Sequence, residues 1–309
     1  MDPLKLTIDE SFFLPEERDG YIVSAEMKKV WAVELDLLNE FSTVCEQYGL
    51  RWFAHAGTML GAVRHHGFIP WDDDIDVVMP REDYDRLCKL APKVFSHPYF
   101  FQCEETDHFF ARTFSRLRNS RTTAILENER PYRYPFNQGI FMDVFPMDNV
   151  PADSDSRDRL YKDLNHLSAR AVLWRTMIHF YHPKTGKGLV KRVSYWLKHL
   201  YFKYVFRGGY HYYLDLHYKR ITRYNAVDTG WVGESVIPPL GRQLWRSEWV
   251  KDTVMVPFEM LQIPIPVQFE ECLSASFGSD WRTPKQIPNL HSGVFFDPDK
   301  PYTDYLIQE

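Results

Sequence analysis

An acidic run that leads directly into an apolar stretch constrains this chain more than any other feature. Asp72, Asp73, Asp74 and Asp76 fall within five positions and are followed by the β-branched pair at 77–78. Such residues favour an extended chain, in which side chains alternate between two faces. Asp74 and Asp76 are therefore predicted to point the same way at the mouth of a buried strand. Adjacent carboxylates repel each other unless a cation lies between them, so the run predicts a divalent metal site for phosphate chemistry.

Two other interpretations of the acidic run can be weighed. An acidic cluster is more often a solvated turn, but this one continues into residues that should be buried. A calcium-binding EF-hand loop needs Gly at its sixth position and Glu at its twelfth. Counted from Asp72, this chain has Val77 and Asp83 at those positions. The calcium-loop interpretation is therefore excluded.

The residues before the acids form a short strand pattern, a Gly-Thr pair and a short helix pattern. Residues 51–56 are aromatic and apolar, and residues 59–66 are predicted to make two helical turns that Gly67 stops. Gly57 lets backbone approach a phosphate, and a following helix N-terminus presents free N–H groups to an anion. Strand, Gly57–Thr58, helix, loop and Asp-x-Asp strand follow one another as in the nucleotidyltransferase fold. We therefore predict an α+β chain with a nucleotidyltransferase-like mixed β-sheet flanked by helices.

The whole segment 55–76, HAGTMLGAVRHHGFIPWDDDID, resembles the signature of the LicD family. That resemblance implies a phosphocholine transferase of bacterial surface glycans, similar to the fukutin-type ribitol-phosphate transferases. Within the signature, the candidate substrate-binding residues are Gly57, Thr58, Arg64 and Trp71.

A second motif, GIFMDVFPMD at 139–148, places one acid inside an apolar strand. Burying a carboxylate without a partner is costly, so Asp143 requires a cation or a donor. The LicD family carries a similar Gly-x-Phe-x-Asp-x-Phe-Pro-x-Asp run. The resemblance implies that Asp143 joins Asp74 and Asp76 as catalytic acids and ligands of Mg²⁺ or Mn²⁺. Asp148 is a weaker candidate that can simply cap the next segment of the chain.

Further family resemblances lie in a basic strand region and near the C-terminus. Arg116 lies in the segment 114–120, FSRLRNS, which resembles a family segment whose basic residue faces the bound diphosphate. The alternative is that the arginines at 112, 116, 118 and 121 coat a solvent face. The segment 278–284, GSDWRTP, resembles the family's Tyr-Gly-Asp-Asp-Tyr-Met-x-Pro run but departs from it at several positions. His291 lies beyond it and is a candidate substrate contact.

An inserted basic helical region is predicted between the second motif and the C-terminal part. Residues 170–223 hold twelve Lys or Arg residues against the single acid Asp215, with aromatic residues interleaved. This composition suits peripheral contact with an anionic membrane, or an anionic glycan or glycolipid acceptor. The alternative is a solvated helical bundle, and no motif supports nucleic-acid binding.

Length and composition fit a folded chain of one or two domains. It has 309 residues, 44% of them hydrophobic, and a net charge of −5. We predict a catalytic core at 24–150, the insert at 151–226 and a C-terminal part at 227–309 that completes the catalytic domain. A long helix should run from the cap Ser24 to Tyr48, with Gly49 as its stop. Four scattered cysteines without zinc spacing, no signal-peptide pattern and no membrane-spanning run indicate a cytoplasmic protein, able to lie peripherally at the inner membrane face.

The expected reaction moves phosphocholine, or a related phospho-alcohol, from CDP-choline or another CDP-alcohol to a glycan hydroxyl. Lipopolysaccharide, teichoic acid and capsule are the acceptors that the family resemblance implies, and CMP leaves. A nucleotidyltransferase that uses an NTP on a small molecule is the first alternative, and a non-catalytic glycan- or membrane-binding protein is the second. A choline head group requires an aromatic cage. Candidates for that cage are Trp71, Tyr132, Tyr134, Trp231 and Trp281.

Overall fold

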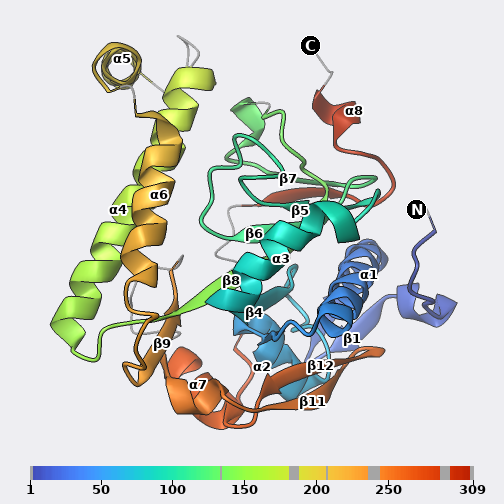
Figure 1. Ribbon diagram of the computed structural model, residues 1–309. Helices are drawn as coiled ribbons and strands as arrows, with labels where there is room; N and C mark the ends of the chain where they lie inside the picture. The colour runs from blue at the N-terminus through green and yellow to red at the C-terminus, as the bar shows by residue number, and fades with distance from the viewer. Residues whose placement is uncertain are drawn as a thin grey trace.

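The computed structural model describes residues 3–132, 134–180, 188–206, 208–235, 244–285 and 293–306. Within these residues, a seven-stranded sheet forms the centre of the molecule (Figure 1). Its main path runs β10-β9-β8-β4-β3, and β6 pairs with both β8 and β5. The strands are β3 Phe53–Ala54, β4 Asp76–Pro80, β5 Tyr99–Gln102, β6 Ser115–Asn119, β8 Ile140–Asn149, β9 Trp231–Glu234 and β10 Leu244–Arg246.

Strand β8 organises this sheet because three strands pair with it. It runs parallel to β4 and antiparallel to β6 and β9, so the sheet is mixed. All of β8 is buried except Asn149, which explains the near-continuous apolar run of the second motif. The predicted α+β class with a mixed sheet is confirmed.

Four helices surround the sheet: α1 Ala25–Tyr48, α2 Ala56–His65, α3 Arg81–Val94 and α7 Phe269–Phe277. Helix α1 starts where the Ser24 hydroxyl accepts a hydrogen bond from the Met27 amide, and it ends at Gly49 in the left-handed conformation, with φ 59°. The predicted bounds of this helix are therefore confirmed. The helix packs on β6 and β8, whereas α3 packs on β4, β5 and β8.

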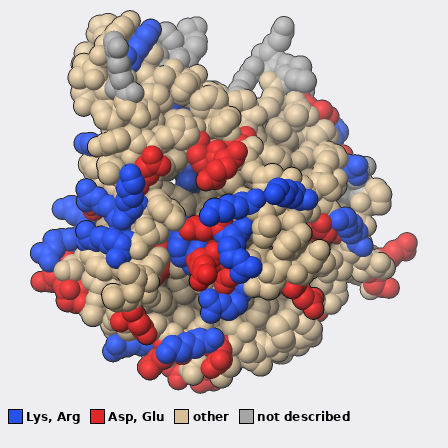
Figure 2. All heavy atoms as spheres, in the orientation of Figure 1, with Lys and Arg blue, Asp and Glu red and all other residues tan. Residues whose placement is uncertain are grey.

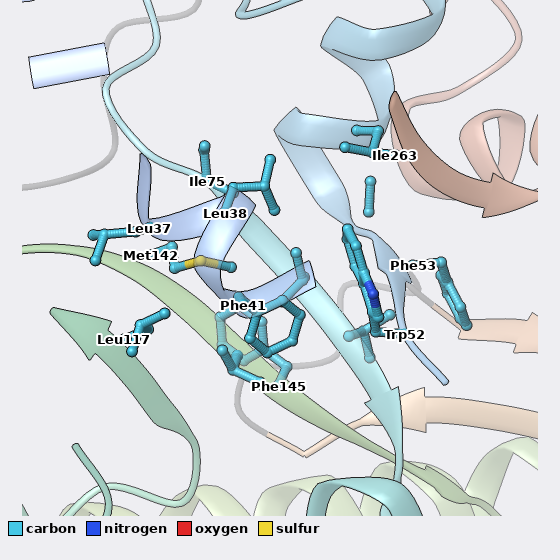
Figure 3. Close-up of a cluster of buried hydrophobic side chains, with 14 of the residues drawn as sticks. Leu37, Leu38, Phe41, Trp52, Phe53, Ile75, Leu117, Met142, Phe145 and Ile263 are labelled. Atoms are coloured by element: carbon cyan, nitrogen blue, oxygen red, sulfur yellow. The ribbon is translucent and has the colours of Figure 1, made fainter. Parts of the chain in front are cut away.

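The main core lies between α1 and the central strands (Figure 3). Leu37, Leu38 and Phe41 of α1 approach Leu117 of β6 and Met142 of β8. All five side chains are at most 1% exposed. The apolar side of α1 is therefore buried against the sheet.

Three predicted boundaries in the signature were wrong. Helix α2 begins at Ala56, so Gly57 and Thr58 lie in its first turn rather than before it. It ends at His65, and the residue that caps it is His66, with φ 55°, rather than Gly67. Strand β4 begins only at Asp76, so residues 72–75 form a loop. That loop follows the α1 surface, where the Trp31 indole N–H donates to the Asp72 carbonyl at 3.0 Å. Contacts to a neighbouring helix thus override the local preference for a strand.

The predicted helical insert is present as α4 Ser154–His179, α5 Leu189–Leu200, the π-helical turn η3 Tyr201–Val205 and α6 Gly209–Thr222. Helices α4 and α6 run side by side at one edge of the sheet, and α5 lies beyond their far end (Figure 1). After the insert, β9 and β10 return to the central sheet. The domain boundaries themselves stay a prediction.

Smaller elements complete the fold. In the basic strand region, the strand is β6, which begins at Ser115 and ends at Asn119. Three two-stranded sheets are β1 Glu16–Arg18 with β2 Tyr21–Val23, β11 Thr253–Phe258 with β12 Leu261–Pro266, and β7 Thr123–Leu126 with β13 Val294–Asp297. Short helices are η1 Glu10–Phe13, η2 Arg130–Tyr132, η4 Ser247–Val250 and α8 Thr303–Leu306. The helices in the described ranges are all too short or too polar to cross a membrane.

Candidate active site

Three charged side chains lie in a row across adjacent strands of the central sheet. Asp76 of β4 is directly opposite Asp143 of β8, and Asp143 is directly opposite Arg116 of β6. Because residues in register share a face of the sheet, all three side chains project to the same side. The pairing of the two motifs therefore brings two of the predicted catalytic acids together.

Arg116 forms a forked ion pair with Asp143. Its Nε lies 2.6 Å from Asp143 Oδ1 and its Nη2 lies 3.3 Å from Oδ2. Both residues are 7% exposed, and the ring of Phe141 lies under the guanidinium, 3.8 Å from its carbon. Asp143 thus has the partner that its burial requires. Its role as a metal ligand, and that of Arg116 as a diphosphate contact, stay predictions.

Arg118, two residues further along β6, is buried as well, whereas Arg112 is half-buried and Arg121 is exposed. Arg118 is 2% exposed, and its guanidinium donates to the Gln102 side chain and to the Gly139 carbonyl, both at 2.6 Å. The alternative interpretation as a solvated basic surface is therefore wrong for Arg116 and Arg118.

Asp148, the weaker candidate of the second motif, accepts a forked hydrogen bond from Arg81. This ion pair ties the end of β8 to α3.

The acidic loop lies next to this row. Carboxylate oxygens of Asp72, Asp73 and Asp74 all lie within 4.8 Å of one another, and all three residues are half-buried. The first turn of α2 supports the loop at two points. The Thr58 hydroxyl accepts a hydrogen bond from the Asp76 amide at 2.8 Å, and a Cβ on Gly57 would lie 2.5 Å from Asp72 Oδ2. Both residues therefore position acids, and their predicted contact with substrate remains to be tested.

Burial and neighbouring acids raise the pKa of two carboxyl groups of the site, Asp72 and Asp76. Burial, then the charges of Asp74 and Asp143, raise the pKa of Asp76 well above its usual value. Burial and the charges of Asp74 and Asp73 do the same to the pKa of Asp72. Crowded carboxylates with raised pKa values are arranged for a cation, and an all-oxygen donor set suits a hard divalent ion. Among the described residues, Asp72, Asp73 and Asp74 form a group whose carboxylate oxygens are close enough to share one ion. The predicted ligand set of Asp74, Asp76 and Asp143 stays a prediction.

A further buried acid, Glu34 of α1, was not identified from the sequence. It is 1% exposed, and its Oε2 has no hydrogen-bond partner among the described residues. Burial and the negative charges of Asp74 and Asp73 raise its pKa well above the usual value, so it lies in the field of the acidic loop. The available signal was its position, four residues from both Val30 and Leu38, which places it at helical spacing from buried apolar residues.

The remaining predicted substrate contacts and cage aromatics differ in how far they are buried. Arg64 donates to the Trp281 carbonyl at 3.0 Å, and burial lowers its pKa. His291 lies outside the described residues. Among the candidate cage aromatics, Tyr134 and Trp281 are only 2% and 4% exposed and are covered by other side chains. Trp71 is half-buried beside the acidic loop, with Tyr21 edge-on to it at 6.1 Å between ring centres.

The fold and this site together define a nucleotidyltransferase-like domain with an acidic centre. Comparison with known families agrees: residues 49–151 match the family described as LicD/FKTN/FKRP, nucleotidyltransferase domain. The match includes both motifs, the acidic loop and the Arg116–Asp143 pair. The resemblance inferred from residues 55–76 is therefore confirmed.

Curated relatives share the same region. The lipopolysaccharide cholinephosphotransferase LicD of Haemophilus influenzae is 33% identical over 118 residues, which is 38% of this chain and 42% of that protein. Uncharacterized proteins of Rickettsia prowazekii and Rickettsia typhi are 35% and 33% identical over 57 residues each. The chain thus aligns with less than half of the length of these relatives.

Proposed function

We propose that this protein transfers phosphocholine, or a related phospho-alcohol, from a CDP-activated donor to a hydroxyl group of a cell-surface glycan. The observation that carries the proposal is the acidic loop and the Asp76–Asp143–Arg116 row inside a LicD-family domain. The named function of the Haemophilus influenzae relative supports phosphocholine as the group and lipopolysaccharide as the first acceptor to test. Teichoic acid and capsule come next as acceptors.

In the proposed reaction, the acceptor oxygen bonds to the distal phosphorus of the donor while the bond from that phosphorus to CMP breaks. The hydroxyl proton passes to a site carboxylate or to solvent. Asp74 and Asp76, with Asp143 as the third predicted ligand, would hold Mg²⁺ or Mn²⁺, which neutralises phosphate charge when bound. Arg116 would contribute its guanidinium to the phosphates while Asp143 keeps it oriented.

A second candidate is transfer of a nucleotide from an NTP to a small molecule. The family description names a nucleotidyltransferase domain, and the same acids would serve that reaction. The leaving group separates the two candidates. Transfer of phosphocholine releases CMP, whereas nucleotidyl transfer releases pyrophosphate.

A thermal-shift panel tests the donor. The protein is heated with Mg²⁺ and, in turn, CDP-choline, CDP-ribitol, CDP-glycerol, CTP and ATP. A ligand at 100 times its dissociation constant stabilises the folded state by about 2.7 kcal/mol, which gives a clear shift. We expect a rise with a CDP-alcohol that EDTA abolishes. A response to CTP or ATP alone would favour the nucleotidyl reaction instead.

A further inference from the structure

The segment α5–η3, Leu189 to Val205, is exposed although it is rich in large apolar side chains. None of the residues of α5 is buried. Val190 is 84% exposed, Leu189 77%, Val205 70% and Trp196 50%. The segment lies beyond the end of the α4–α6 pair, away from the central sheet (Figure 1). Monomeric soluble proteins rarely leave so contiguous an apolar surface without a partner.

The apolar and basic side chains of α5 lie on opposite sides of the helix. At 3.6 residues per turn, the aliphatic and Trp positions at 189, 190, 193, 196, 197 and 200 fall within an arc of about 120°, and Tyr195 lies outside it. Ser194, Lys191, Lys198 and Arg192 fall in the remaining arc, together with His199. This separation, with few buried residues, is typical of helices that lie in a membrane interface.

An apolar groove of about 660 Å³ lies alongside α5. Its walls come from α4, α5, η3 and α6, and most of the side chains are aliphatic or aromatic, with Arg170 and Lys198 among them. That volume is within the range of pockets that bind small ligands. The apolar side of α5 therefore faces an open space that hydrocarbon can fill.

The charge of the segment indicates what covers it. Residues 188–206 contain Lys191, Arg192, Lys198 and Lys203 and no acid, although the whole chain carries a net charge of −5. In Figure 2 the surface formed by α5 is tan and blue without red, whereas acidic and basic side chains mix over the rest of this face. A basic rim beside exposed apolar residues complements the headgroups and hydrocarbon of an anionic lipid layer.

We propose that α5 and η3 dock the protein on the surface of an anionic lipid bilayer. The apolar arc enters the boundary between headgroups and acyl chains, hydrocarbon fills the groove beside α5, and the four cationic side chains contact lipid headgroups. Docking of this kind narrows the predicted membrane contact of residues 170–223 to one segment. It is independent of the transferase proposal, because it needs no donor, metal or turnover.

Co-sedimentation of the full chain with lipid vesicles tests this proposal. Vesicles of phosphatidylcholine alone are compared with vesicles that contain 30% phosphatidylglycerol. We expect binding to the anionic vesicles, weakened by salt, and at least tenfold weaker binding to the neutral ones. Equal binding to both, or no binding to either, would overturn the proposal.

Two variants locate the contact. Val190→Glu with Leu197→Glu should lower the partition coefficient on anionic vesicles at least tenfold. Its matched control, Leu14→Glu with Ile22→Glu, makes the same charge change at exposed apolar residues elsewhere and should lower it much less. Lys191→Gln with Lys198→Gln should lower it about 25-fold, at roughly fivefold per basic residue. The control for this pair is Lys89→Gln with Lys93→Gln.

Size-exclusion chromatography and thermal melting of the same variants complete the test. We expect all of them to melt as the parent does, because the changed side chains are exposed, and to elute at the same volume. The lipid proposal is wrong if the α5 variants elute later than the parent and neither the parent nor the variants bind vesicles. In that case the exposed apolar surface of α5 joins two copies of the chain.

Discussion

At the residue scale, the candidate site depends on charges that the fold forces together. Asp76, Asp143 and Arg116 share one face of the sheet because three strands pair in register. Asp143 is compensated by Arg116, whereas Asp76 and Asp72 have pKa values raised by burial and by neighbouring acids. The site therefore contains one satisfied acid and several that repel one another. That imbalance is what a bound cation would correct.

Replacing Arg116 should lower the stability of the fold, because Asp143 would then be buried without a counter-ion. Arg116→Met leaves Asp143 buried without a counter-ion and should lower the free energy of unfolding by about 3–5 kcal/mol. The double variant Arg116→Met with Asp143→Leu removes both charges and should recover most of that loss. Urea unfolding of the wild type, both single variants and the double variant measures this coupling. If the double variant is as unstable as the sum of the single ones, the pair is not coupled.

The buried His217 of α6 should make stability depend on pH. Burial and the charge of Arg81 lower the pKa of His217 from 6.5 to about 4. The unfolded chain therefore binds more protons than the folded protein across this window, and stability falls as pH drops through it. The full effect is about 3 kcal/mol, from the 1.36 kcal/mol that each pKa unit represents.

The measurement is urea unfolding of wild type and His217→Gln between pH 8 and pH 4. The advantage of the wild type should be constant above pH 7.5 and should shrink steadily below pH 6.5. His108→Gln removes an exposed imidazole and serves as the control. A pH-independent difference for His217→Gln would contradict the assignment.

At the element scale, sequence patterns located helices and strands better than they located side chains. Helix α1 and strand β8 were predicted almost to the residue, because an N-cap serine, a C-cap glycine and a long apolar run are local signals. The acidic loop was misread as a strand, since its course depends on Trp31 of a distant helix. Glu34 and the pairing of Arg116 with Asp143 also required tertiary structure. An acid at helical spacing from apolar residues was the only sequence signal for Glu34.

Two glycines of α2 should respond differently to the same substitution. A Cβ on Gly57 would meet the Asp72 carboxylate at 2.5 Å, whereas one on Gly61 would meet the Gly67 carbonyl at 2.4 Å. The Asp72 carboxylate can move away from an added methyl group, but the Gly67 carbonyl cannot move without displacing the backbone that follows α2. Gly57→Ala should therefore melt within a few degrees of wild type and lose most activity, while Gly61→Ala should be strongly destabilised. Equal melting temperatures, or full activity of Gly57→Ala, would refute this division of roles.

At the scale of the whole molecule, the family match and the insert occupy different parts of the structure. Residues 49–151 supply β3, β4, β6 and β8 with the acidic loop, and β9 and β10 extend the same sheet after the insert. The α4–α6 pair holds α5 away from the sheet (Figure 1). The proposed chemistry and the proposed membrane contact thus lie on separate elements, so each can be tested without the other.

The most direct test of the proposed transfer reaction is the nucleotide product formed by wild type and by Asp76→Asn. Both proteins are incubated with CDP-choline, Mg²⁺ and lipopolysaccharide, teichoic acid or capsule in turn, and CMP and pyrophosphate are quantified. We expect CMP release by the wild type with one of these acceptors and at least a hundredfold slower release by Asp76→Asn, which keeps the shape of the side chain but not its charge. Turnover by Asp76→Asn at the wild-type rate would contradict the proposed reaction. It would also be contradicted if no CDP-alcohol yields CMP and pyrophosphate forms when CTP replaces CDP-choline.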